Sequence, residues 1–411
     1  MNDSALSLRT RAENSPRTTN VWRARLASAS LTLTAVDFVL LLAELGLRAV
    51  DWQVEQHRTR VRISNVGDVR VRANAGEIDC YPSNPGGYFD IDLRRAEDRA
   101  RLTSRGYSDF SVALPDSPWC VEFRYNSLGL RGPEYGPRRP DVRRVIVLGD
   151  SFTEGQGVRA ADTYVAMLGR LLDAGAPGHV EVLNFGQRAL DFPDLYRLFE
   201  RALELDPDLV VYGFVLNDGD RSPEFDRLWP RLNDWIMVRR PPPAPSPWSS
   251  NLAAFVRERL ESARIARDTM RWYRDMYAEP NHAGWNRTRA YLRSMNATLA
   301  RRGGSLLVAL WPLLVDLEGA YPFEDVHARI ARVCARSGIP FHDLLGVLRG
   351  RSSATLWVHP ADWHPNALAH RLAAEDLAPL VRRLLEAQAD APAALAPAEP
   401  GWPQRPAPHR Q

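Results

Sequence analysis

The sequence has little cysteine for its length, with only Cys80, Cys120 and Cys334 among 411 residues. Three cysteines are too few for a disulfide scaffold. No Cys-x-x-Cys pair and no His/Cys spacing typical of zinc sites occurs, so we expect no bound metal. Cys334 lies in an apolar helical pattern, which indicates a buried thiol. Cys80 and Cys120 lie in one upstream segment, and a bond between them is expected only if that segment is exported.

Strong net charge is also missing, because the formal charge at pH 7 is only +3. No basic patch dominates, so we expect no nucleic-acid partner. The apolar share of 45% and the charged share of 25% are those of a globular protein with a substantial core. The length exceeds what one ordinary domain needs, which indicates a catalytic-sized domain with additional segments.

Only one long apolar run occurs, at residues 26–43, and several arginines precede it. Its length is close to the minimum for a membrane-spanning helix. Asp37 interrupts it, at a cost of about 2.5–3.5 kcal/mol for a central position. The arginines predict an anchor at residues 26–50 whose carboxyl side faces the periplasm or cell exterior. A cleaved signal peptide and a soluble amphipathic helix remain alternatives, although 43–46 (AELG) is a poor cleavage site.

The remaining organisation follows from composition and hydrophobic pattern. Residues 1–25 are polar and predicted to be disordered, as is the Ala/Pro-rich tail at 388–411. Residues 51–140 are rich in turn formers and predict a small accessory segment, mostly β or irregular. Residues 141–387 form the expected main domain, with an insertion at about 219–250 whose proline-rich part, 239–247, must be an exposed loop.

Within the main domain, short apolar runs alternate with helical patterns. This alternation predicts a parallel sheet covered by helices on both faces. The expected strands lie at 145–148, 180–185, 209–215, 306–310 and 339–341. The expected helices lie at 161–174, 192–205, 257–277, 285–302, 326–336 and 367–387.

Four short segments follow these strands or precede the last helix. Gly149-Asp150-Ser151-Phe152 comes first, and alone it is equally typical of a helix cap. Next are Asn184-Phe185-Gly186 and Leu216-Asn217-Asp218, which alone indicate an ordinary strand-end glycine and an Asx turn. The last is Asp362-Trp363-His364, in which a histidine, the usual base for a serine hydroxyl, follows a nearby acid. The carboxyl ends of parallel strands share one crevice, so their common placement favours a single site.

The four segments together resemble the SGNH (GDSL-type) serine hydrolases, whose marker residues match Ser151, Gly186, Asn217 and His364. The resemblance implies a three-layer α/β sandwich with a five-stranded parallel, flavodoxin-like sheet and no cofactor. It implies Ser151 as nucleophile, His364 as base and Asp362 as the orienting acid. The N–H groups of Ser151 and Gly186 and the Asn217 side chain would form the oxyanion hole.

The acid is a departure from the family pattern, in which it stands three positions before the histidine. Ala361 occupies that position here, and Asp362 stands two before. This spacing resembles that of sugar O-acetyltransferases in the same superfamily. The upstream segment Tyr125-Asn126-Ser127-Leu128-Gly129-Leu130-Arg131-Gly132 resembles a segment of bacterial membrane-anchored members.

These features predict a serine esterase for O-acyl groups, with acetyl esters of an envelope polysaccharide as candidate substrates. An envelope O-acyltransferase using the same residues is the first alternative. A non-catalytic binding protein that retains the fold is the second. The expected partners are an acyl-ester substrate and a lipid bilayer contacted by the N-terminal helix.

Overall fold

The computed structural model describes residues 17–49, 78–82, 120–174, 178–188, 190–230, 250–359 and 362–389. Within the described part, the chain divides into two units. The smaller comprises Met1–Glu55 and Pro242–Arg264, and the larger comprises Gln56–Pro241 and Ile265–Gln411. The predicted proline-rich loop at 239–247 lies outside the described residues.

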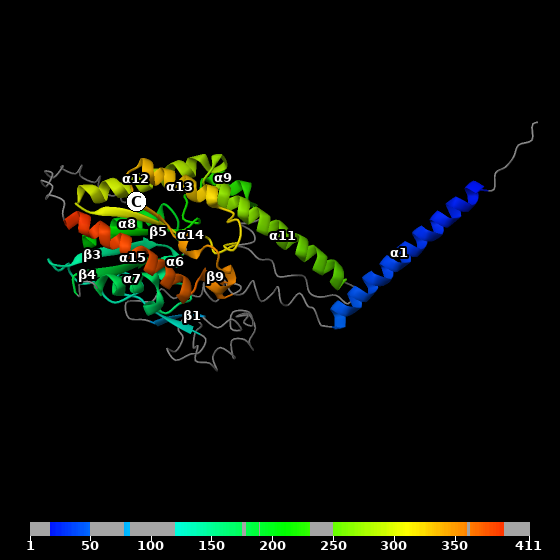
Figure 1. The fold of residues 1–411 in the computed structure, drawn as a ribbon, viewed down its shortest axis with the longest axis horizontal. Coiled ribbons are helices and arrows are strands. Elements are labelled where there is room, and N and C mark those ends of the chain that lie inside the picture. Colours follow the sequence, from blue (N-terminus) through cyan, green and yellow to red (C-terminus); the bar gives the residue numbers. More distant parts are fainter. Residues whose placement is uncertain are drawn as a thin grey trace, which may run out of the picture. The chain divides into compact units, whose positions relative to one another are not determined.

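The larger unit is built on a five-stranded parallel sheet, as the strand and helix pattern predicts (Figure 1). The strands lie in the order β4-β3-β5-β6-β7, so the chain starts in the interior and reverses direction after β4. Their bounds are β3 Arg143–Gly149, β4 Val180–Gly186, β5 Leu209–Phe214, β6 Ser305–Leu310 and β7 Phe341–Asp343. A sheet of this order places its switch point between β3 and β5, where ligands bind at the carboxyl ends.

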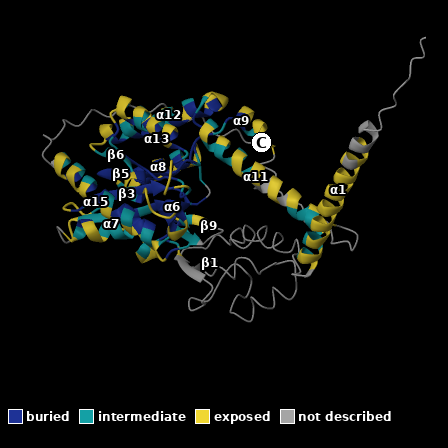
Figure 2. Cartoon of the chain, turned by 45° about the vertical axis from the view of Figure 1, so that its right-hand side comes forward, coloured by how far each residue is buried: buried dark blue, intermediate teal, exposed yellow. Residues whose placement is uncertain are grey.

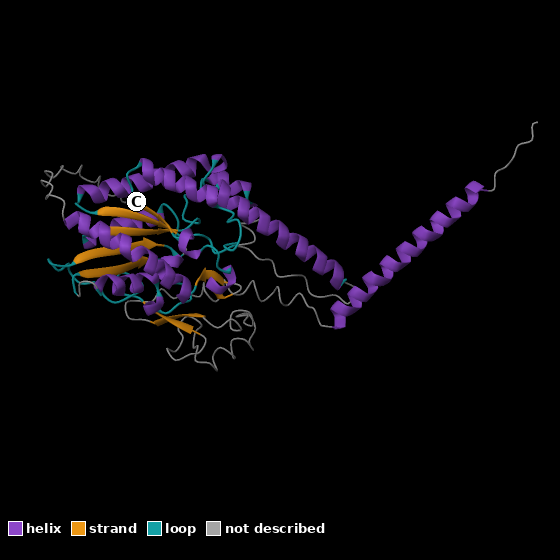
Figure 3. Cartoon of the chain, in the orientation of Figure 1, coloured by secondary structure: helices purple, strands orange, loops and turns teal. Residues whose placement is uncertain are grey.

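Helices cover both faces of the sheet (Figure 3). One face carries α7 (Tyr164–Asp173) and α15 (Ala367–Ala389), which pack against each other. The other carries α8 (Asp194–Ala202), α12 (His282–Arg301) and α13 (Glu324–Arg336). The result is the predicted three-layer α/β sandwich.

The core lies in the sheet and the helix faces against it (Figure 2). Val145, Ile146, Val147 and Leu148 are each fully buried, because a central parallel strand is covered on both sides. Cys334 is a buried free thiol, as its helical pattern predicts.

The described residues form further helices and a hairpin. The helices are α6 Ser151–Glu154, α9 Pro223–Leu228, α11 Asn251–Asp275 and α14 Leu345–Leu348. The 3₁₀ helices are Ala160–Asp162, Leu203–Leu205, Glu279–Asn281 and Ser353–Leu356. A two-stranded antiparallel hairpin, β8 Trp357–His359 with β9 Asp362–Pro365, immediately precedes α15.

The segment predicted to be accessory contributes a second antiparallel pair, β1 Ile78–Pro82 with β2 Cys120–Arg124. Its backbone register sets Cys80 opposite Glu122 and Cys120 opposite Pro82, so the two cysteines are not directly opposed. The predicted bond between them concerns side chains outside the described part of the chain.

The smaller unit contains α1, Arg17–Ala49, which begins before the predicted start of the apolar helix. Residues 17–25, predicted to be disordered, are therefore helical, because extending an established helix costs little. Residues Arg25–Arg48 are long and apolar enough to cross a membrane, with a mean hydropathy of 1.9 and no burial. At its carboxyl end, the Glu44 carboxylate accepts hydrogen bonds from the backbone of Asn251 and Leu252 and so caps α11.

Candidate functional site

Ser151 is the first residue of α6, directly after β3. Asp150 caps this helix, because its Oδ1 accepts a hydrogen bond from the Phe152 N–H at 2.9 Å. The capping interpretation of Gly-Asp-Ser is therefore correct for Asp150 and leaves the serine hydroxyl free for another role. Ser151 is 8% exposed, and burial raises the pKa of the Asp150 carboxyl beside it.

A row of three glycines lets α6 lie close over the ends of the strands. Gly149 pairs in register with Gly186 on β4 and with Gly213 on β5. A Cβ on Gly149 would lie 2.2 Å from Thr153 Oγ1, and one on Gly213 would lie 2.3 Å from Tyr164 OH. Since no side chain fits at these positions, the row fixes how near the nucleophile helix approaches the sheet.

His364 and Ser151 meet, although 213 positions separate them. His364 Nε2 lies 2.9 Å from Ser151 Oγ. The histidine belongs to β9, which contacts α6. The Phe152 ring packs edge-on against the imidazole at 5.5 Å. Ser151 Oγ also lies 3.4 Å from Asp150 Oδ2. A hydroxyl in hydrogen-bond contact with an imidazole nitrogen is the pairing that nucleophilic acyl transfer needs.

The other imidazole nitrogen contacts a residue that the sequence pattern does not single out. Gln156 Nε2 lies 3.2 Å from His364 Nδ1, and Gln156 belongs to the loop that follows α6. Asp362, the predicted acid, lies on β9 with its backbone opposite His359. Its side chain is outside the described part of the structure, so its role stays a prediction.

Asn217 stands in the turn after β5 and shares a partner with the nucleophile. Its Nδ2 donates to Asp150 Oδ2 at 3.0 Å, which leaves a second amide hydrogen for another acceptor. The turn is held by Asp218, whose carboxyl accepts hydrogen bonds from the Val215 N–H and the Tyr212 hydroxyl. Burial raises the pKa of the Asp218 carboxyl well above its usual range.

Gly186 lies at the end of β4, and its predicted role as an oxyanion donor stays a prediction. Its N–H donates to Asn184 Oδ1 at 2.8 Å, so it is engaged within its own strand end. A Cβ on Gly186 would lie 2.0 Å from the Glu154 backbone nitrogen. The absence of a side chain at Gly186 therefore lets the α6 backbone lie close to the end of β4.

A buried ionic cluster adjoins the same helix and was missed in the sequence. Arg188 Nε lies 2.7 Å from Glu154 Oε2, with both side chains almost fully buried. The Arg188 N–H also donates to this carboxylate, and the Tyr125 hydroxyl donates to Glu154 Oε1. The sequence carries no signal for this pair, because nothing in it links two residues that lie 34 positions apart.

Beneath the site, Thr153 Oγ1 lies 2.8 Å from Tyr164 OH, and the Tyr164 N–H donates to His370 Nδ1. His370 is fully buried, and this burial lowers its pKa to about 3. The imidazole is therefore neutral, with its proton on Nε2. His370 packs under the site and stacks on Tyr164.

Two other histidines have carboxylate partners that no sequence pattern indicates. His327 Nδ1 lies 3.0 Å from the Asp343 carboxylate, and His342 Nε2 lies 2.6 Å from Asp376 Oδ2. The remaining nitrogen of His327 faces the Tyr321 hydroxyl at 3.4 Å. These pairs link helices to the β7 edge of the sheet.

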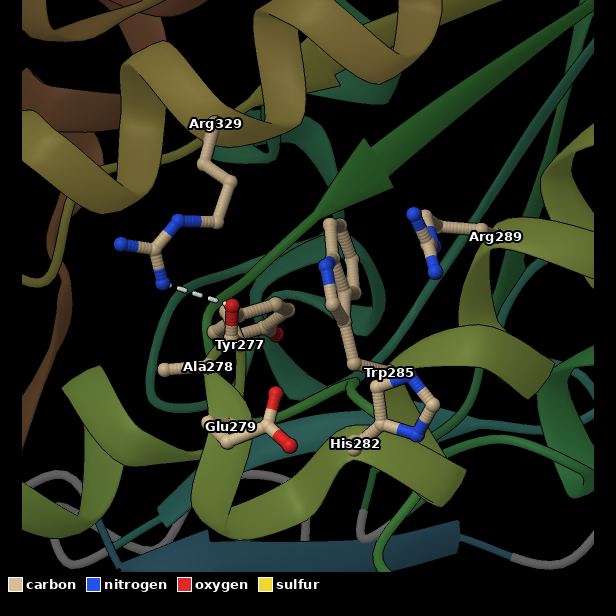
Figure 4. Close-up of a pocket in the computed structure, with 7 residues that line it drawn as sticks. All are labelled: Tyr277, Ala278, Glu279, His282, Trp285, Arg289 and Arg329. Carbon is tan, nitrogen blue, oxygen red and sulfur yellow. Dashed lines mark hydrogen bonds between the residues drawn. The ribbon is translucent and has the colours of Figure 1, made fainter.

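A surface pocket of about 430 Å³ lies apart from these residues, beside the end of α11 and the starts of α12 and α13 (Figure 4). Arg329 Nη1 donates to the Tyr277 carbonyl at 2.6 Å within it. Its lining includes Glu279, His282, Trp285 and Arg289. Neither Ser151 nor His364 contributes to this lining.

Comparison with known proteins gives one family match. Residues 147–328 match the model of the GDSL-like Lipase/Acylhydrolase family. No curated protein matches the chain in sequence.

Matches among solved structures include a putative lipolytic protein of the G-D-S-L family from Desulfitobacterium hafniense, at 15% identity and a TM-score of 0.35. It covers 58% of this chain and 98% of its own. A lipase/acylhydrolase from Enterococcus faecalis has 15% identity and a TM-score of 0.36, over 59% and 96% of the two chains. A mutant of the acetylxylan esterase Axe2 from Geobacillus stearothermophilus has 15% identity and a TM-score of 0.35, over 61% and 96%.

Proposed function

We propose that this chain, whose residues 147–328 match the GDSL-like Lipase/Acylhydrolase family, cleaves O-acyl esters through an acyl-enzyme on Ser151. The observation that carries this proposal is the 2.9 Å contact between Ser151 Oγ and His364 Nε2. It joins a nucleophile and a base from distant parts of the chain at the carboxyl edge of the sheet.

In this mechanism His364 removes the proton as Ser151 Oγ attacks the ester carbonyl, and then returns it to the departing alcohol. Water, deprotonated by His364, then releases the acid from the serine. The oxyanion is stabilised by the Ser151 N–H at the start of α6 and by the Asn217 amide. The Gly186 N–H is left out of this set because Asn184 accepts it. Asp362 is proposed to stabilise the imidazolium from its place on β9.

The decisive test is Ser151→Ala in the full-length chain, assayed on a short-chain aryl ester and with an organophosphonate probe. We expect turnover to fall by orders of magnitude and labelling to disappear. Ser294→Ala is the control, because this half-buried serine of α12 bonds Tyr196 rather than a histidine. Unchanged turnover in Ser151→Ala would remove this residue from the mechanism, and a wild-type protein that never reacts with the probe would favour the non-catalytic alternative.

We further propose that the alcohol part of the substrate is a saccharide, such as an acetylated envelope polysaccharide. Trp363, adjacent to His364, is 54% exposed and stacks on Trp357 at 5.5 Å. Trp357 is itself held by a hydrogen bond from its indole N–H to the Leu314 carbonyl. An exposed, braced indole beside the base offers a flat apolar surface for a sugar ring. Trp363→Ala should raise KM for acetylated oligosaccharides while leaving the labelling rate of Ser151 unchanged.

Transfer to a sugar hydroxyl is the second candidate, favoured by the two-residue spacing of Asp362 and His364. It uses the same acyl-enzyme and differs only in which hydroxyl attacks it. An acyl donor supplied with and without an oligosaccharide acceptor separates the two. Acylated sugar forming faster than free acid would favour transfer.

We also propose that α1 anchors the protein in a bilayer, with the catalytic domain on the periplasmic or extracellular side. The support is the apolar span Arg25–Arg48, whose exposed side chains include Leu31, Phe38 and Leu41, together with the arginines before it. The protein should stay with membranes after alkaline carbonate extraction. A protease should digest the catalytic domain only when it is added to the periplasmic or extracellular side of the membrane. Release of a shortened chain with a new amino terminus would instead indicate a cleaved signal sequence.

A further inference from the structure

We propose that Arg131 is a positioning residue of the ester-hydrolysing site, acting through the loop at residues 154–158 that joins nucleophile and base. This inference rests on the proposed function of Ser151 and His364. Arg131 lies before residues 147–328, the part of the chain that matches the family model. It belongs to the segment Tyr125–Gly132 and is 2% exposed.

The Arg131 guanidinium donates to three carbonyl groups of that loop. Nη1 lies 3.1 Å from the Glu154 oxygen and 2.7 Å from the Gly155 oxygen, while Nη2 lies 2.7 Å from the Val158 oxygen. Carbonyls at the end of a helix lack intrahelical partners, and α6 ends at Glu154. A planar guanidinium reaches several of them at once, in a geometry that a lysine ammonium does not reproduce.

The loop held in this way contacts both strands of the hairpin that carries the base. Gln156 reaches His364 Nδ1 on β9. Gly157 packs so closely on β8 that a Cβ there would lie 2.5 Å from Val358 Cγ1. Because the same loop begins at the nucleophile helix, its conformation sets the position of His364 relative to Ser151.

Arg131 is itself presented by a preformed turn. Asn126 Oδ1 accepts hydrogen bonds from the Leu128 and Leu130 N–H groups, and Asn126 Nδ2 donates to the Pro133 carbonyl. Gly129 supplies the left-handed backbone, with φ of +71°, that the turn requires. Leu130 is fully buried in the core. The segment Tyr125–Gly132 therefore holds the Arg131 guanidinium in a fixed position.

The test compares Arg131→Lys with Arg144→Lys in the full-length protein. Arg144 is the control, because it is equally buried and its guanidinium also donates to backbone carbonyls, those of Leu205 and Gly136, near the opposite end of β3, where it pairs with Glu181 as well. We expect Arg131→Lys to lower kcat on a short-chain aryl ester about 100-fold, with KM within about threefold of wild type. Arg144→Lys should stay within about threefold of the wild-type kcat at a temperature where both variants are folded.

A double-mutant cycle with Gln156→Ala separates positioning from general stability. If Arg131 acts through the loop, the double variant should be about as slow as the slower single variant rather than showing the product of the two losses. Multiplicative losses, equal losses in the two lysine variants, or a wild-type kcat in Arg131→Lys would each overturn the proposal. If Arg131→Lys does not fold, a wild-type kcat in Gln156→Ala overturns it.

Wild-type and Ser151→Ala proteins are assayed in the same experiment, so that a failure of the proposed function can be told apart from a failure of the proposed role of Arg131. Wild-type turnover above that of Ser151→Ala upholds the proposed function, whatever the arginine variants do. Absence of that difference overturns the proposed function and, with it, the role of Arg131.

Discussion

Replacing Gly186 by alanine tests why position 186 is a glycine. The row of glycines at 149, 186 and 213 would require it to make room for α6, whereas an oxyanion contact would require only its N–H group. A Cβ at Gly186 would lie 2.0 Å from the Glu154 nitrogen and 2.4 Å from the Thr153 carbonyl carbon. Ordinary contact begins at 3.4 Å, so a gap of about 1.4 Å must open between β4 and α6. Both clashing atoms are backbone, so α6 and its first residue, Ser151, have to move.

Overpacking of this kind costs about 1–3 kcal/mol. For a domain of this size, that corresponds to a Tm lowered by roughly 3–10 °C. A displacement of about 1 Å at the nucleophile lowers turnover on the order of 100-fold. We therefore expect Gly186→Ala to lose about two orders of magnitude in kcat/KM on a short-chain aryl ester and to melt earlier in a thermal scan.

Gly346→Ala is the control, because a Cβ at this position of α14 meets nothing within 4 Å. Alanine is favoured over glycine in a helix by about 0.5–1 kcal/mol, so this variant should be at least as stable as wild type and fully active. The reasoning is refuted if Gly186→Ala keeps activity within tenfold of wild type and an unchanged Tm.

Three further outcomes are expected. Asn217→Ala should lower kcat about 100- to 1000-fold at similar KM, since one oxyanion donor is lost; a KM-only effect in steady-state kinetics would contradict this. Glu154→Gln should lower the free energy of unfolding by about 3–5 kcal/mol in urea titrations, because it removes the carboxylate that pairs with the buried Arg188 guanidinium; a neutral result would argue against the buried pair. His370 has a folded pKa of about 3, far below its unfolded value, so the unfolded chain takes up a proton that the folded chain does not. Its contribution is complete above about pH 6.5 and is lost as the pH falls toward 3, at up to about 1.4 kcal/mol per pH unit; His370→Asn should flatten the stability profile between pH 6 and 4, and an unchanged slope would rule this out.

The sequence by itself determined the architecture of the larger unit. An apolar run lies at or near each of the five strands, because burial on both faces of a parallel sheet imposes a continuous apolar run. Helical periodicity likewise lies at or near the main helices. Even the weak run at 339–341 shares one residue, Phe341, with β7 (Phe341–Asp343). The order of Ser151, Gly186, Asn217 and His364 along the chain also pointed to one shared crevice, since each lies at or near a strand end.

Only the tertiary structure decided which atoms meet there. Local pattern carries no information on partners far apart in sequence, such as Arg131 with the loop after α6, Glu154 with Arg188, or Gln156 with His364. Local sequence pattern also did not distinguish a glycine that makes room for a ligand from one that makes room for another stretch of backbone. At Gly186 the atoms that a side chain would meet are backbone, because three strand ends in register bring the nucleophile helix close to the sheet. Periodicity records whether a residue is buried, whereas the contacts that give a buried residue its role arise only when the whole chain has folded.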